Sequence, residues 1–200
     1  MNPKLPIVNT KQYYDEIENP SLALTDNVFL ADIVLTSESM NAFGHASIYL
    51  LDEQYSKSLR EKNLQQKDLP VKNRTLSEWA NNDVISLIRE SPEHRPTFSK
   101  IDLAYIHILK LCRDFGLSLR KLQMARDSLF FPVDTIGGCN LLEIAYAYFD
   151  KSQTDEAVYL LMDRQGRCNI IRKCDFEMML DFRTINNNFI LNLSEVWNEI

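Results

Sequence analysis

Glycine is scarce in this chain of 200 residues, which contains only five glycines. A loop that cradles phosphate groups with its backbone needs several glycines close together, and this sequence offers little material for one. The scarcity argues against a nucleotide site built on a glycine-rich loop. We therefore expect no cofactor of that kind.

Cysteine is limited to four widely spaced residues, with no CxxC pair among them: Cys112, Cys139, Cys168 and Cys174. Structural zinc sites generally use four ligands, so we expect reduced thiols and no metal site. Cys168 and Cys174 leave a weaker alternative open, because they lie across an expected hairpin and its exit. Cys112 falls in an apolar helical stripe and is interpreted as a small core residue.

Histidine is also rare, with three residues, and no nucleophile motif such as GxSxG is present. Carboxylate pairs such as Asp155-Glu156 stand in polar stretches, which is typical of solvated side chains. The sequence therefore predicts a protein that is not an enzyme.

Long apolar runs are missing too, since no run approaches the roughly 18 to 20 residues that span a bilayer. The start of the chain, Met1–Lys4, lacks the apolar segment of a signal peptide. We therefore expect a cytoplasmic protein with no membrane partner.

Charge is distributed unevenly along the chain, whose net charge is −6. Residues 56–130 hold 14 Lys and Arg against 9 Asp and Glu, a balance of +5, while the remainder has a balance of −11. A basic middle segment favours a local surface that faces phosphate. The acidic flanks should limit non-specific binding to nucleic acid, which depends on phosphate neutralisation.

The pattern of apolar residues predicts an α+β protein with three regions. Residues 1–55 are expected to form an N-terminal extension of mixed structure, in which the apolar runs at 28–35 and 46–51 suit short strands or short buried helices. Residues 56–128 are expected to be mainly helical. Residues 129–200 are expected to form a small α+β region for assembly or sensing.

Four helices are expected in the middle region. The first is Lys57–Lys67, and the second is Thr75–Ile88 with Asn73 as its N-cap. The third begins at Ser99, whose capping box uses Asp102, and its inward stripe is Leu103, Ile106, Leu109 and Cys112. Gly116 suits the C-terminal end of this helix, and Ser118 is positioned to cap the fourth.

A hairpin is expected in the last region, with strands at 157–162 and 167–172 joined by a turn at 163–166 in which Gly166 supplies a positive φ. A helix at 175–181, a strand at 189–193 and a short helix capped by Ser194 should follow. The aromatic residues here are more typical of a second core than of a ligand pocket: Tyr146, Tyr148, Phe149, Tyr159 and Trp197.

Three short segments carry the functional signal, and they are Arg74–Trp79, Phe98–Leu103 and Phe115–Leu119. Two short helices around a turn let the second lie in the major groove of DNA, and a proline-bearing segment after them can contact the backbone through a cation; here that segment is residues 90–96, with Arg95 as its cation. The order and spacing of the segments resemble the winged helix-turn-helix of the MerR-like and excisionase-like DNA-binding domains. The resemblance covers residues 56–128 and implies double-stranded DNA as partner and a homodimer as assembly.

Candidate DNA contacts are the basic and amide side chains near these segments. At the start of the second helix, Asn and Arg can read base edges, and Lys and Arg can hold phosphate. The wing and the start of the fourth helix add further cations. The candidates are Lys72, Asn73, Arg74, Arg95, Lys100, Arg120 and Lys121.

A second hypothesis is a protein-interaction adaptor that keeps this fold without gripping DNA. Ser77 replaces the arginine that the family carries in the second helix, and Glu78 replaces its aromatic residue. Asp83 replaces a glycine. Two added acids on a phosphate-facing helix favour a protein partner over DNA, so the sequence leaves both functions open.

Overall fold

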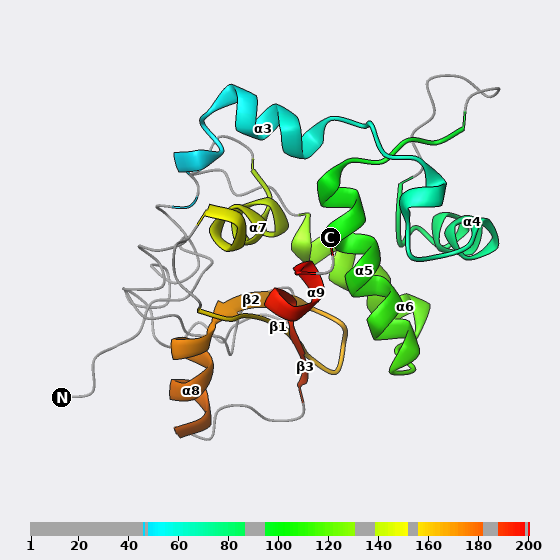
Figure 1. The fold of residues 1–200 in the computed structure, drawn as a ribbon. Helices are drawn as coiled ribbons and strands as arrows, with labels where there is room; N and C mark the ends of the chain where they lie inside the picture. The colour runs from blue at the N-terminus through cyan, green and yellow to red at the C-terminus, as the bar shows by residue number, and fades with distance from the viewer. Residues whose placement is uncertain are drawn as a thin grey trace, which may run out of the picture.

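The structure is a computed structural model, and it describes residues 46, 48–86, 95–130, 139–151, 156–181, 188–198 and 200. Within these residues, seven α-helices accompany a three-stranded antiparallel sheet near the C-terminus (Figure 1). The predicted α+β class is confirmed. Of the apolar runs expected near the N-terminus, 28–35 lies outside the described residues, and Ala46, Ile48 and Tyr49 in the other run are helical.

The elements follow in this order: α3 (Glu53–Arg60), a 3-10 turn η1 (Gln66–Asp68), α4 (Asn73–Asn81), α5 (Lys100–Asp114), α6 (Leu119–Leu129), α7 (Leu141–Lys151), β1 (Val158–Met162), β2 (Cys168–Arg172), α8 (Lys173–Asp181), β3 (Phe189–Asn192) and α9 (Leu193–Trp197).

Helix α5 begins and ends as the sequence predicts. The Ser99 Oγ accepts a hydrogen bond from the Asp102 N–H at 3.1 Å, and the Asp102 carboxylate accepts one from the Ser99 N–H at 2.8 Å. This reciprocal pair satisfies two of the amide groups that a helix start leaves unpaired. After the last turn, Gly116 has a φ of +84°, and Ser118 caps α6. The predicted inward stripe of α5 is fully buried.

The predicted hairpin is also confirmed. Strand β1 pairs antiparallel with β2 on one side and with β3 on the other, so the strand order is β2-β1-β3. The turn contains Gly166 at a φ of +101°. Strands β1 and β2 are almost wholly buried; β1 is a continuous apolar run, whereas β2 also buries Asn169 and Arg172.

Helices α5 and α6 connect the N-terminal helices to the sheet (Figure 1). Helix α5 packs against α3, α7 and α9, and α6 packs against β2 and α7. Buried side chains from residues before and after position 128 therefore belong to one hydrophobic core. The boundaries assigned to three regions stay a prediction, and the end predicted at residue 128 falls inside α6.

The C-terminal aromatic residues lie mostly in this core. The rings of Tyr146 and Trp197 meet edge to face with centroids 5.3 Å apart, and Phe149 lies 5.5 Å from Trp197. Tyr148 is buried as well, whereas Tyr159 is half-buried and stacks on Phe176. Within the described ranges, no helix is both long and apolar enough to cross a membrane.

Several predicted helix bounds were wrong. The Asp52 side chain starts α3 earlier than predicted, by accepting hydrogen bonds from two amides of its first turn, and the helix ends at Arg60 instead of Lys67. The second helix spans Asn73–Asn81 and not Thr75–Ile88, so Asn73 is its first residue and not its cap. Position 83, at a φ of +55°, turns the chain out of the helix.

The last helix is capped by Asn192, not by the predicted Ser194. The Asn192 side chain accepts a hydrogen bond from the Ser194 N–H at 3.1 Å. The Ser194 Oγ instead accepts a hydrogen bond from the Val158 N–H at 2.9 Å and so ties α9 to the start of β1. This tertiary contact overrides the local preference of serine for a cap.

Candidate nucleic-acid interface

Helix α4 has one buried face and one exposed face. Leu76 and Trp79 are each 2% exposed and fix the inner face. On the outer face, Asn73, Ser77 and Asn81 form an uncharged polar row at the spacing i, i+4, i+8, and a base and an acid lie beside this row. The exposed residues of this face are Asn73, Ser77, Asn81, Arg74 and Glu78. Because residues four apart lie above one another on a helix, the row can follow the floor of a groove.

The entry to α4 is held by a short antiparallel contact between segments far apart in sequence. Leu64 and Phe98 exchange two backbone hydrogen bonds, each of 2.9 Å. The turn η1 follows Leu64 and leads to α4. Along the chain, the contact at Leu64 is therefore followed by η1, by α4, and by the segment that returns through Phe98 to α5.

The exit of α4 is held by Arg126 of α6. Its Nη1 donates to the backbone oxygen of Asp83 at 3.2 Å, and its Nη2 donates to the Ser86 Oγ at 2.8 Å. These bonds secure the residue whose positive φ ends the helix. Sequence reasoning missed Arg126 as a positioning residue, because its partners lie 43 and 40 positions away and no local pattern marks such a contact.

The structure separates the seven predicted contact residues into groups. Lys72, Asn73 and Arg74 are exposed at the start of α4. Arg95 and Lys100 are exposed on either side of Phe98, the first in the segment that returns to α5 and the second at the start of α5. The wing expected at 90–96 lies outside the described residues except for its last two positions, 95 and 96.

The third group is exposed Arg120 and half-buried Lys121, which lie in the first turn of α6. Helix α5 stands between Lys100 and this group, and its 15 residues give it a length of about 22 Å. A surface that includes all three groups must therefore extend along the whole of α5.

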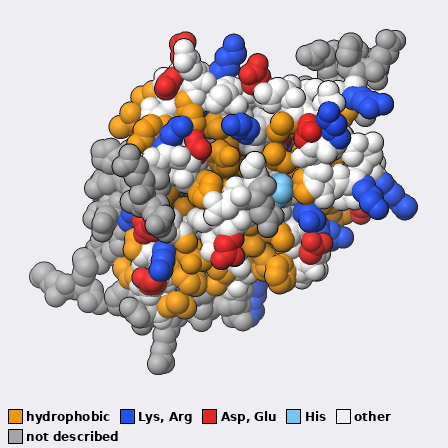
Figure 2. Space-filling model, in the orientation of Figure 1, with side chains coloured by type: hydrophobic (Ala, Val, Ile, Leu, Met, Phe, Trp, Pro, Cys, Tyr) orange, Lys and Arg blue, Asp and Glu red, His pale blue; other side chains and the backbone are white. Residues whose placement is uncertain are grey.

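The six cations in these groups form no ion pair with a carboxylate of the described residues. An unpaired surface cation is available to a phosphate without first losing a protein partner. Figure 2 shows Lys and Arg side chains along the side of the molecule that carries α4, with Asp and Glu side chains among them. Glu78 and Asp83 are both exposed.

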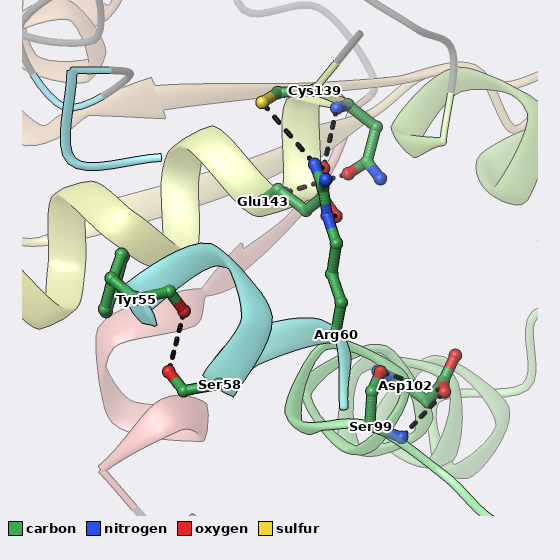
Figure 3. A network of polar contacts seen from close by, with 8 residues as sticks. Tyr55, Ser58, Arg60, Ser99, Asp102, Cys139 and Glu143 are labelled. Atoms are coloured by element: carbon green, nitrogen blue, oxygen red, sulfur yellow. Dashed lines mark hydrogen bonds and ion pairs between the residues drawn. The ribbon is translucent and has the colours of Figure 1, made fainter. Parts of the chain in front are cut away.

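An ion pair between α3 and α7 is the second polar feature, and sequence reasoning did not find it (Figure 3). The Arg60 guanidinium donates to both oxygens of Glu143, from Nε at 2.6 Å and from Nη2 at 2.9 Å. The hydrogen bond to Glu143 raises the pKa of Arg60 above its ordinary value, against the opposing effect of burial. Nη2 also contacts the Cys139 Sγ at 3.5 Å, and burial raises the pKa of that thiol.

Glu143 also starts α7, because its carboxylate accepts the Asn140 N–H and its own N–H donates to the Asn140 side chain. The pair with Arg60 thereby joins the start of α7 to α3. Both oxygens of Glu143 have structural partners, so we interpret the pair as a tie between helices.

A third cluster surrounds Glu156, just before β1. One carboxylate oxygen accepts hydrogen bonds from the Tyr148 hydroxyl at 2.8 Å and from Arg172 at 3.1 Å, and the other accepts the Cys174 N–H at 3.3 Å. Burial raises the pKa of Glu156, but the hydrogen bonds from Cys174 and Tyr148 and the charge of Arg172 outweigh it and lower the pKa. The cluster joins α7, β2 and α8.

In the described part of the chain, no three His, Cys, Asp or Glu side chains lie together in a group that could hold a metal ion. Cys168 is buried, and Cys174 contacts Arg172 at 3.0 Å.

Comparison of the chain with protein-family models, curated proteins and solved structures gives no match.

Proposed function

We propose that the protein is a DNA-binding regulatory protein that presents α4 to the major groove. The observation that carries this proposal is the outer face of α4, where amide and hydroxyl side chains stand beside Arg74 on a helix anchored by Leu76 and Trp79. Asparagine and arginine can form bidentate contacts with adenine and guanine edges, respectively. A transcriptional regulator or a mobile-element accessory factor would use such a helix.

The order of the elements supports the same proposal. A winged helix-turn-helix needs a short helix before the recognition helix, a return segment and a supporting helix. Here η1, α4, the segment through Phe98 and α5 stand in these places. A homodimer remains part of the proposal, since two half-sites multiply specificity.

Binding of the full chain to a random duplex library, followed by titration of a selected duplex against salt, tests the proposal. We expect the logarithm of the affinity to fall linearly with the logarithm of the salt concentration. Arg74→Ala and Arg95→Ala should each weaken binding about 5- to 10-fold and lower the salt slope by about 1. Absence of salt-dependent binding even at low ionic strength would overturn the proposal.

The matched control is Lys173→Ala, which removes an exposed cation at the start of α8, on the opposite side of the sheet from α4 (Figure 1). Its ion pair with Glu177 is exposed and therefore contributes little to stability. We expect this variant to bind the selected duplex as the unaltered chain does. Equal losses in all three variants would indicate a general effect of charge and not an interface on α4.

A protein-interaction adaptor is the second candidate, and the exposed acids Glu78 and Asp83 favour it. If α4 meets DNA, Glu78→Gln removes a repelling charge and should strengthen binding several-fold. If α4 meets a protein, a stoichiometric partner should be recovered from a pull-down, and Glu78→Gln should weaken its capture while DNA binding stays undetectable. The same variant thus moves the two readouts in opposite directions.

A further inference from the structure

A pocket of about 160 Å³ lies between the exit of α4, the first half of α5 and the end of α6. Its walls are mainly apolar side chains from these three segments and from Phe98, which precedes α5. These are Ile85, Phe98, Tyr105, Ile106 and Phe130. Four of the five are buried, so the walls belong to the hydrophobic core and keep a fixed shape.

The size of the pocket suits a single aromatic ring. An apolar cavity of about 150 Å³ lined by aliphatic and aromatic side chains is large enough to bind benzene. In this pocket the rings of Tyr105 and Phe130 meet edge to face, with centroids 5.0 Å apart. A third ring can extend this arrangement, because aromatic rings favour edge-to-face and offset contacts.

The polar side chains of the pocket favour an anion. Lys62 and Arg126 contribute two positive charges, and Asp102 contributes one negative charge. Lys62 is held loosely, since its Nζ lies 3.6 Å from the Asp102 carboxylate. The same carboxylate oxygen already accepts two shorter hydrogen bonds from Ser99. Lys62 can therefore turn to an incoming carboxylate without leaving Asp102 unpaired.

We propose that this pocket binds a monocyclic aromatic carboxylate, with the ring against Tyr105 and Phe130 and the carboxylate between Lys62 and Arg126. Bidentate recognition of a carboxylate is what a guanidinium does best. The ligand would compete with the Asp83 oxygen and the Ser86 hydroxyl for Arg126. Its binding would therefore loosen the exit of α4.

The direct test is a calorimetric titration of the full chain with benzoate. We expect saturable binding with one site per chain and a Kd of about 1 mM or tighter, as the small size of the ligand allows. Benzamide keeps the ring without the charge and should bind at least 10-fold more weakly. Acetate keeps the charge without the ring and should not bind measurably. Absence of saturable benzoate binding, or equal binding of benzamide, would overturn the proposal.

Two lysine variants locate the site. Lys62→Gln removes a cation of the pocket and should weaken benzoate binding about 5- to 20-fold. Lys67→Gln removes an exposed cation from the nearby turn η1, outside the pocket, and should leave the affinity unchanged. Equal affinities of the two variants would place benzoate elsewhere. Both side chains are at least partly exposed, so both variants should keep the fold, which their melting curves would verify.

The consequence for DNA rests on the proposed function. A benzoate concentration that saturates the unaltered chain should lower its affinity for the selected duplex, because benzoate draws Arg126 away from the exit of α4. The same concentration should act much less on Lys62→Gln, which binds benzoate more weakly. A chain that binds benzoate but no DNA would overturn the proposed function and leave the pocket assignment intact. A chain that binds DNA but no benzoate would overturn the pocket assignment and leave the proposed function intact.

Discussion

Arg126 shows how a single residue can determine the position of a candidate interface from outside it. Its two hydrogen bonds secure the backbone at Asp83 and the side chain of Ser86, so the direction in which α4 ends depends on α6. The sequence shows Arg126 only as one more cation in a helix. Its role arises from a contact between residues about 40 positions apart, and such contacts leave no periodic signal.

The cysteines provide a residue-scale prediction. Cys112, Cys139 and Cys168 are buried, whereas Cys174 is partly exposed. Burial raises the pKa of Cys112 to about 12, so roughly one part in 10,000 is thiolate at pH 8, and the thiolate is the reactive form. We expect iodoacetamide at pH 8 to modify Cys174 first, with the other three reacting only after unfolding in urea.

Peptide mass spectrometry after timed quenching identifies the modified residue. Cys174→Ser should lose the fast reaction and leave a chain that is inert until it unfolds. Fast modification of Cys112 or Cys168 in the folded chain would contradict the burial described above.

The two ends of α5 and the start of α6 were predicted correctly from local sequence, and the reason is physical. The bonds of Ser99 with Asp102 join residues three apart, so the motif is complete within the sequence itself. The start of α4 was predicted wrongly because Lys72 stands at the N-cap without a side-chain bond. The chain that leads into α4 is held instead by the contact between Leu64 and Phe98, which are 34 positions apart in sequence. The sequence therefore indicates the local motifs of the candidate site and not the tertiary contacts that orient α4.

The two serine caps allow a prediction about element stability. Ser99 is 5% exposed and its box with Asp102 is complete, so Ser99→Ala should lower the free energy of unfolding by about 1 to 2 kcal/mol. Ser118 is exposed and its bond from the Lys121 N–H is long, at 3.4 Å. Ser118→Ala should cost about 0.5 kcal/mol. Urea unfolding followed by circular dichroism measures both, and equal costs would contradict this ranking.

At the scale of the whole molecule, the hairpin and the candidate interface share one support. The β1–β2 turn lies directly against the start of α6, where a Cβ built on Gly166 would stand 2.5 Å from the Lys121 backbone oxygen. Helix α6 holds Arg126 further along, so the sheet, the hairpin turn and the exit of α4 are joined through one helix. The sequence predicted the hairpin from its own residues but could not indicate where the hairpin docks.

Two glycines test whether this docking matters. Gly116 and Gly166 both have positive φ, but a Cβ on Gly116 meets no atom within 4 Å, whereas one on Gly166 overlaps the backbone of Lys121. Gly116→Ala should therefore cost only backbone strain, about 1 to 2 kcal/mol. Gly166→Ala adds the overlap, which a backbone neighbour cannot relieve by a rotamer change, and should cost roughly 3 kcal/mol or more in total.

Chemical unfolding of both variants gives the difference, and hydrogen exchange of the α6 amides shows where it arises. Because Gly166→Ala pushes the hairpin away from the start of α6, exchange should accelerate in α6 and at the exit of α4, which Arg126 secures. Gly116→Ala should leave those amides protected. If the two variants were equally stable and exchanged alike, the hairpin would not support α6, and the coupling between the sheet and α4 would have to be abandoned.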